Sequence, residues 1–203
     1  EEIFHDTIRA GADVVTAGNH VWDQREALDF SKREDRFLRP ANFPKGTAGK
    51  GEGLYIAKNG ARVLVSNVMG RVFMHPDLDD PFIAAEKILG ACPLGEQADA
   101  VFFDFHAEAT SEKQCFGHFV DGRASAVVGT HTHVPTADYQ ILRNGTAYMS
   151  DAGMCGDYDS SLGMEKEEPL NRFLSKVPKG RFEAASGPAT VCGVGIEISD
   201  RTG

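Results

Sequence analysis

Short apolar runs alternate with helical patterns of hydrophobic positions along most of the chain. Three runs, at residues 13–17, 100–105 and 125–129, are continuous rather than alternating, and the first two are followed by helical patterns at residues 24–32 and 111–119. Continuous apolar runs of this length are typical of strands buried on both faces. The pattern therefore predicts an α/β protein in which helices cover a sheet.

Two Asn-Gly pairs separate further apolar segments and predict hairpins. Asn59-Gly60 lies between residues 54–57 and 62–68, and Asn144-Gly145 lies between residues 139–142 and 146–149. Asn-Gly suits tight turns that need a positive φ angle. The sheets are therefore expected to be mixed, with parallel and antiparallel parts.

Several residues mark the expected ends of helices and strands. Pro81 suits the first turn of a helix, because a missing N–H costs nothing there. Asp23 with Glu26 predicts a capping box for the helix that begins near residue 24. A first helix is expected to stop at Gly11, and the apolar run at residues 191–198 predicts a strand.

Composition and net charge indicate which ligands this protein does not bind and in which cell compartment it works. The chain has 203 residues and a formal net charge of −9, which argues against a nucleic-acid polymer as ligand. No apolar stretch is long enough for a membrane span, so no membrane association is expected. The four cysteines are widely spaced without a C-x-x-C pair, which favours reduced thiols and the cytoplasm.

Metal-capable side chains follow the three continuous apolar runs. The first run leads to Asn19 and His20, the second to His106, and the third to His131 and His133. Ligands in α/β folds bind beyond the carboxyl ends of the strands, so these side chains are expected to meet in one crevice. Imidazole and amide oxygen suit manganese, iron or zinc, and the absence of nearby thiolates argues against a structural zinc site.

Four longer motifs carry a family resemblance, in the order G-N-H-V-W-D (18–23), R-P-A-N-F-P (39–44), D-F-H-A-E-A-T-S-E-K (104–113) and D-G-R-A-S-A-V-V-G-T-H-T-H-V (121–134). Over essentially the whole chain, they resemble the calcineurin-like metallophosphoesterases, and more narrowly the YmdB-like bacterial cyclic-nucleotide phosphodiesterases. The resemblance implies an α/β/β/α layered sandwich of mixed sheets, with residues 1–203 forming one domain. The resemblance also implies that the chains of family members begin before the position of Glu1. We therefore expect the first βαβ unit and a short C-terminal piece to be missing here.

The resemblance also implies roles for the five polar residues. Asn19, His106 and His131 would bind one divalent metal ion and His133 a second, with manganese or iron preferred and zinc as an alternative. His20 would be the catalytic residue. Family members carry a metal-binding Asp and a bridging Glu in segments that would precede Glu1, so the isolated chain lacks those carboxylates and its own activity is in question.

Four carboxylates of this chain are candidate replacements for them: Asp23, Asp104, Glu108 and Asp151. Asp104 lies within an apolar run and Asp23 is expected to cap a helix, so a role outside the metal site is preferred for each of the four. Glu108 and Thr110 are instead expected to orient His106, since metal-bound histidines commonly need such a partner.

The expected reaction is hydrolysis of a small cyclic nucleotide, a 2′,3′-cyclic nucleoside monophosphate, by a metal-held hydroxide with His20 as general acid. Two alternatives stay open: another metallophosphoesterase activity, such as phosphomonoester hydrolysis, and a non-catalytic metal- or nucleotide-binding regulator. A homo-oligomer is compatible with the sequence, and no substrate-binding residue is assigned.

Overall fold

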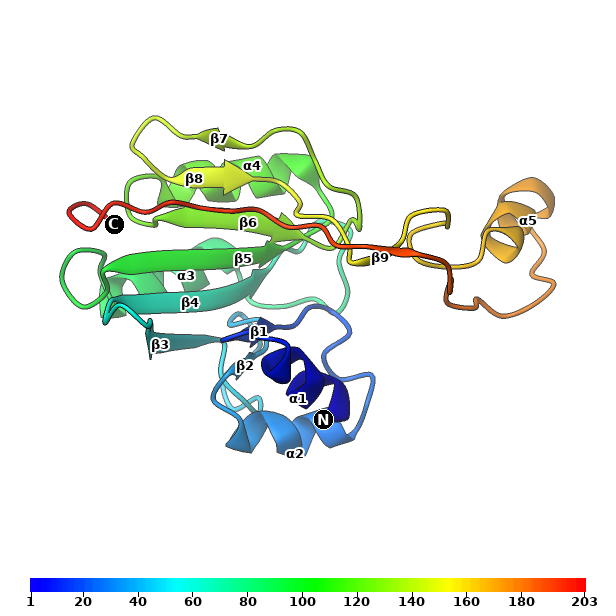
Figure 1. The fold of residues 1–203 in the computed structure, drawn as a ribbon, viewed down its shortest axis with the longest axis horizontal. Coiled ribbons are helices and arrows are strands. Elements are labelled where there is room, and N and C mark those ends of the chain that lie inside the picture. Colours follow the sequence, from blue (N-terminus) through cyan, green and yellow to red (C-terminus); the bar gives the residue numbers. More distant parts are fainter.

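A six-stranded mixed sheet forms the body of the protein, as the computed structural model of residues 1–203 shows (Figure 1). Its strand order is β3-β4-β5-β6-β8-β7, with the two edge strands antiparallel to their neighbours and the inner four parallel. The strands are β3 (Glu52–Ile56), β4 (Arg62–Met69), β5 (Ala100–His106), β6 (Ala126–Thr130), β7 (Gln140–Ile141) and β8 (Ala147–Met149). The predicted mixed α/β architecture is confirmed.

Both predicted hairpins close this sheet at its edges. β3 and β4 pair across Asn59-Gly60, and β7 and β8 pair across Asn144-Gly145. Gly60 and Gly145 have φ angles of 89° and 106°, the left-handed region that a side chain would strain.

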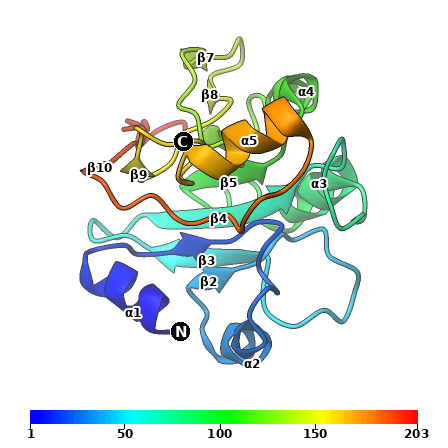
Figure 2. The same cartoon turned by 90° about the vertical axis from the view of Figure 1, so that its right-hand side faces the viewer.

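Two helices, α3 (Pro81–Ala91) and α4 (Thr110–Val120), cover one face of the sheet (Figures 1 and 2). Pro81 opens α3 as expected, and Asp80 caps it by accepting the N–H groups of Phe82 and Ile83. The main core lies between these helices and the sheet, where the Phe105 and Phe116 rings stack at 4.1 Å. This packing fixes the positions of β5 and β6 against the helices, and both strands lead into the predicted site.

A smaller unit lies below the sheet in Figure 1. It consists of α1 (Glu2–Arg9), α2 (Glu26–Arg33) and the parallel pair β1 (Val15–Thr16) and β2 (Phe37–Leu38). The predicted capping box is wrong: α2 begins at Glu26 after Arg25 without a side-chain cap, and Asp23 instead contacts His20.

An arm carrying α5 (Glu167–Ser175) extends from the carboxyl-end side of the sheet and returns through β10 (Ala189–Thr190), which pairs with β9 (Gly156–Asp157) (Figure 1). Residues 191–198 form no strand, so that prediction is wrong. Their backbone crosses the face of the sheet instead of lying along an edge, so it finds no strand to pair with.

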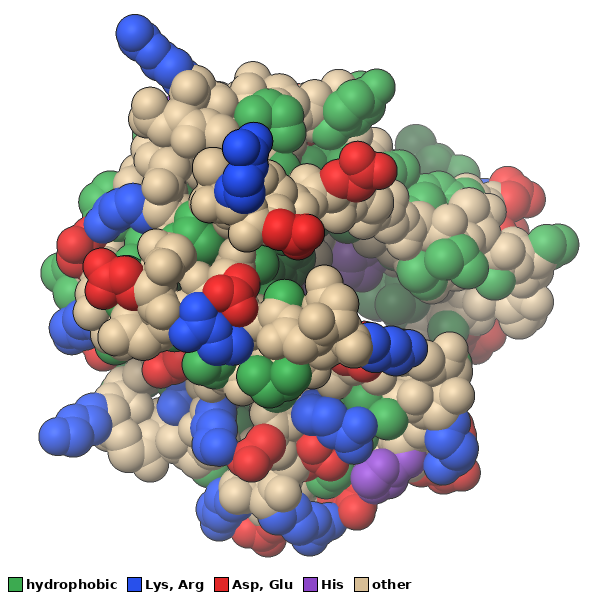
Figure 3. All heavy atoms as spheres, turned by 60° about the vertical axis from the view of Figure 1, so that its left-hand side comes forward, with side chains coloured by type: hydrophobic (Ala, Val, Ile, Leu, Met, Phe, Trp, Pro, Cys, Tyr) green, Lys and Arg blue, Asp and Glu red, His purple; other side chains and the backbone are tan.

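None of the five helices has the length and apolar content needed to cross a bilayer. On the face drawn in Figure 3, acidic and basic side chains are interspersed and neither sign forms one continuous field. Local charge at the site therefore has to be considered residue by residue.

Candidate metal centre

Three of the predicted ligands meet beyond the carboxyl ends of β1, β5 and β6. The Asn19 Oδ1 atom lies 2.9 Å from His106 Nε2, and His131 Nδ1 lies 3.2 Å from the same nitrogen. The register explains the meeting, because His106 is paired with Thr130, the residue before His131. Parallel strands end at one edge of a sheet, so His106 and His131 share the edge where β5 and β6 end. Asn19 reaches the same place from β1, which pairs with β2 outside this sheet.

Gly18 makes the contact with Asn19 feasible. A Cβ atom at this position would lie 2.4 Å from the His106 ring, so only glycine lets the two segments approach this closely.

The protonation of His106 follows from its partners. Its Nδ1 lies 2.9 Å from Thr130 Oγ1, and that hydroxyl donates to Asp104 Oδ1 at 2.7 Å. Because the single hydroxyl proton goes to Asp104, Thr130 accepts from His106 and the imidazole proton sits on Nδ1. Nε2 of His106 therefore presents a lone pair to Asn19 and His131.

The same reasoning applies to His131. Its Nε2 lies 3.2 Å from the Glu108 carboxylate, which accepts the imidazole proton and leaves a lone pair on Nδ1. Asn19 Oδ1, His106 Nε2 and His131 Nδ1 thus face one another as three acceptors without a hydrogen between them. Such a convergence is complementary to a cation, and amide oxygen with two imidazoles is a donor set that suits a divalent transition metal.

Burial makes the two histidines poor bases. Burial, with the nearby His131 imidazole and Lys113 ammonium, lowers the pKa of His106 to about 3. Burial also lowers the pKa of His131, although Glu108 opposes this effect. Both rings are therefore neutral at neutral pH, the state that a metal ligand requires.

Asp104 orients His106 through the Thr130 hydroxyl, a role that the sequence did not predict for it. Its carboxylate is buried and bonded to Thr130 and to Asn67 Nδ2, and burial raises its pKa to about 6 despite these hydrogen bonds. The expectation that Glu108 and Thr110 orient His106 is not met, since Glu108 contacts His131 instead. The alternation of β5 was the available signal, because Asp104 and His106 lie two residues apart on one face.

His133 and His20 lie at the periphery of this cluster. His133 Nδ1 donates to the Leu162 carbonyl at 3.1 Å, and its backbone, like that of His131, is left-handed, with φ angles of 64° and 104°. His20 is 78% exposed, and its Nδ1 lies 2.9 Å from Asp23 Oδ2. Left-handed non-glycine residues cluster at ligand sites, where the surroundings hold them in place.

The candidate replacement carboxylates all have other partners. Asp23 contacts His20, Asp104 accepts from Thr130, Glu108 contacts His131, and Asp151 forms an ion pair with Lys113. Within residues 1–203, no three His, Cys, Asp or Glu side chains are grouped as a ready metal centre, so the three-donor cluster depends on the amide of Asn19. The cluster of Asn19, His106 and His131 offers donors for one divalent ion.

Amide and imidazole donors gathered at the strand ends of a mixed α/β sheet match the arrangement expected of a metallophosphoesterase. Within that class, the chain belongs to the YmdB-like protein family, which matches it over residues 1–203. The predicted resemblance is confirmed.

Similar proteins come from several bacteria. A Bacillus subtilis protein named 2′,3′-cyclic-nucleotide 2′-phosphodiesterase is 50% identical over 202 residues, which cover 100% of this chain and 75% of that protein. A hypothetical protein from Thermus thermophilus has a crystal structure with a TM-score of 0.85 and 46% identity, covering 93% of this chain and 72% of that one. A Mycoplasma pneumoniae structure described as a novel phosphatase has a TM-score of 0.83 and 30% identity, covering 93% and 67%.

Proposed function

We propose that the chain is a metal-dependent phosphodiesterase that hydrolyses 2′,3′-cyclic nucleoside monophosphates. The observation that carries the proposal is the convergence of Asn19 Oδ1 and His131 Nδ1 on His106 Nε2, at 2.9 Å and 3.2 Å, beyond the ends of β5 and β6. The name of the Bacillus subtilis relative supports the substrate class and cleavage at the 2′ oxygen.

Asn19, His106 and His131 would hold one divalent ion, with manganese or iron preferred over zinc, and His133 would contribute to a second. When bound, such ions polarise the phosphoryl oxygens of a diester and stabilise the charge that develops there. A cation at this position also gives a chain with a net charge of −9 a local attraction for phosphate.

His20 would act as the general acid. Its Nδ1 is held by Asp23, so Nε2 is left to deliver a proton to the leaving 2′ oxygen as the P–O2′ bond breaks and water adds to phosphorus. The products would be a nucleoside 3′-phosphate and an imidazole that regains its proton from water. Asp23 would orient the ring, as the carboxylate does in a nucleophile–base–carboxylate triad.

We place this activity in the cytoplasm and in a single domain, and a homo-oligomer is compatible with it. All four cysteines are free thiols, which fits a reducing compartment.

The test is hydrolysis of 2′,3′-cyclic AMP by this chain with added Mn²⁺, compared with a chelated sample and with His20→Ala. We expect metal-dependent turnover that falls by about 10²- to 10⁴-fold in His20→Ala. His118→Ala, which changes an exposed histidine of α4, is the matched control and should keep the parental rate.

Three outcomes would contradict the proposal. Faster hydrolysis of 5′-AMP than of the cyclic substrate would favour a phosphomonoesterase. Nucleotide or metal binding without turnover would favour a regulator, and full activity of His20→Ala would remove the assigned acid.

A further inference from the structure

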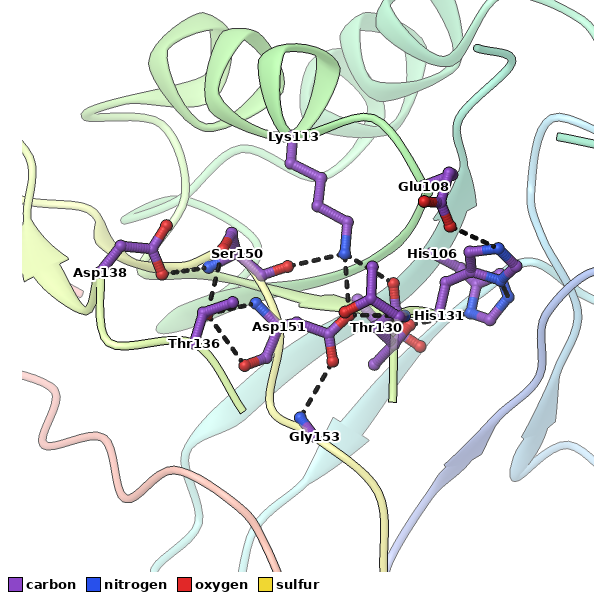
Figure 4. A network of polar contacts seen from close by, with 12 residues as sticks. His106, Glu108, Lys113, Thr130, His131, Thr136, Asp138, Ser150, Asp151 and Gly153 are labelled. Atoms are coloured by element: carbon purple, nitrogen blue, oxygen red, sulfur yellow. Dashed lines mark hydrogen bonds and ion pairs between the residues drawn. The ribbon is translucent and has the colours of Figure 1, made fainter. Parts of the chain in front are cut away.

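Lys113 is a buried cation directly behind the candidate metal centre. It lies on α4, its side chain is only 3% exposed, and it is the one lysine among the buried residues. Figure 4 shows its side chain extending from the helix towards the strand ends that carry Thr130 and Ser150. Burying an ammonium group is costly unless it is paired and fully hydrogen-bonded, so its partners need to be identified.

The three N–H groups of the Lys113 ammonium meet three acceptors. Nζ lies 2.8 Å from the Thr130 carbonyl, 2.8 Å from the Ser150 carbonyl and 2.9 Å from Asp151 Oδ2. An ammonium has three donors, so this set uses all of them and leaves none for a substrate. Lys113 therefore joins the ends of β6 and β8 and has no free donor for chemistry.

Asp151 carries the connection on to the ligand loop. Its Oδ2 accepts the N–H of Thr132 at 2.9 Å, and its Oδ1 accepts the N–H of Gly153 at 2.9 Å. Burial would raise the pKa of Asp151, but Lys113 and these backbone donors outweigh it and lower the pKa, so the carboxylate stays charged.

The backbone around His131 is thus held from both sides. The Thr130 carbonyl before it is fixed by Lys113, and the Thr132 N–H after it is fixed by Asp151. His131 itself has a φ angle of 104°, a conformation that non-glycine residues keep only when their surroundings impose it.

We propose that Lys113, acting through Asp151, is a positioning residue that holds the 130–133 loop so that His131 presents Nδ1 to the metal centre. The inference rests on the proposed function for its biological meaning. Its structural alternative is that Lys113 only stabilises the fold, and the test has to separate the two.

The test is a titration of the metal-free chain with Co²⁺, followed by visible absorption without substrate, with His131→Ala defining binding outside the site. Lys113→Met removes the ammonium but keeps much of the side-chain volume. We expect it to bind Co²⁺ about 10- to 100-fold more weakly, with an altered absorption spectrum, as is usual when a group that orients a metal ligand is lost. Lys87→Met, on the exposed side of α3, is the matched control and should leave both readings unchanged.

A second variant covers the case in which Lys113→Met does not fold. Lys113→Arg keeps the positive charge beside Asp151, but its planar guanidinium cannot place three donors on one nitrogen. We expect it to fold and to bind Co²⁺ more weakly than the parent. Parental affinity and spectrum in either folded variant would overturn the inference, and so would failure of both variants to fold, because Lys113 would then support the whole fold.

The outcomes also separate this inference from the proposed function. A parent chain that binds Co²⁺ but leaves 2′,3′-cyclic AMP intact would refute the function and leave the positioning role standing. A parent chain that hydrolyses the nucleotide, with Lys113→Met binding Co²⁺ normally, would refute the positioning role alone. A parent chain that binds no Co²⁺ would refute both.

Discussion

Replacing His106 with asparagine should make the protein less sensitive to acid. In the folded chain, burial lowers the pKa of His106 to about 3, whereas an unfolded histidine has a pKa of about 6.5. Between these values the unfolded state binds more protons, so the free energy of unfolding rises with pH across this window and falls on acidification. His106→Asn removes the titrating ring and keeps an amide donor near Thr130.

The size of the effect follows from the two pKa values. Between pH 7 and pH 4.5, protonation of His106 in the unfolded state alone should lower the free energy of unfolding by about 2.5 kcal/mol. Burial raises the pKa of Asp104 to about 6, so Asp104 contributes in the opposite direction over the same interval. Because Asp104 and His131 are present in both chains, their contributions cancel to first order when parent and variant are compared.

Urea unfolding followed by circular dichroism, at pH 7 and pH 4.5 with a chelator present, measures this difference. The chelator is needed because a bound cation would keep the imidazole unprotonated. We expect the parent to lose about 2.5 kcal/mol more than His106→Asn on acidification. Equal losses in the two chains would refute the assignment of His106 as a buried neutral imidazole.

Three further substitutions test the packing of β6 and the support of the ligand loop, with Gly90→Ala in α3 as a control. Gly129→Ala would place a Cβ atom 1.7 Å from the Ser150 carbonyl oxygen, so it should destabilise the fold by about 1–3 kcal/mol or more. Gly90→Ala, in a helix with nothing within 4 Å of the new atom, should instead stabilise it by about 0.5–1 kcal/mol. Thermal unfolding measures both, and an unchanged melting temperature for Gly129→Ala would contradict the close approach of β6 to Ser150. Thr130→Val removes the hydroxyl between His106 and Asp104 and should weaken Mn²⁺ binding by about 10- to 100-fold in calorimetric titration. Parental affinity would mean that this hydroxyl does not set the His106 tautomer.

The sequence alone was sufficient for the main strands and the strand-end donors. Continuous apolar runs identified β5 and β6, and the two Asn-Gly pairs placed both hairpins. Because the parallel strands β5 and β6 end at one edge, the positions of His106 and His131 in the chain were enough to predict that these two meet. Asn19 was predicted to join them and does, but it follows β1 of a separate two-stranded sheet, so tertiary packing brings it there. These features depend on local patterns and on one general rule of sheet geometry.

The partners of the polar side chains were decided only by the tertiary structure. Asp23 was expected to cap α2 but contacts His20, and Glu108 was expected beside His106 but contacts His131. The ion pair between Lys113 and Asp151 joins residues 38 positions apart and had no signal in the sequence. A charged side chain in a helical pattern is ordinarily solvated, and only the packing of α4 against the strand ends buries this one. The residue types that can bind a metal are therefore determined by the sequence. Their orientation and protonation depend on contacts that exist only after folding.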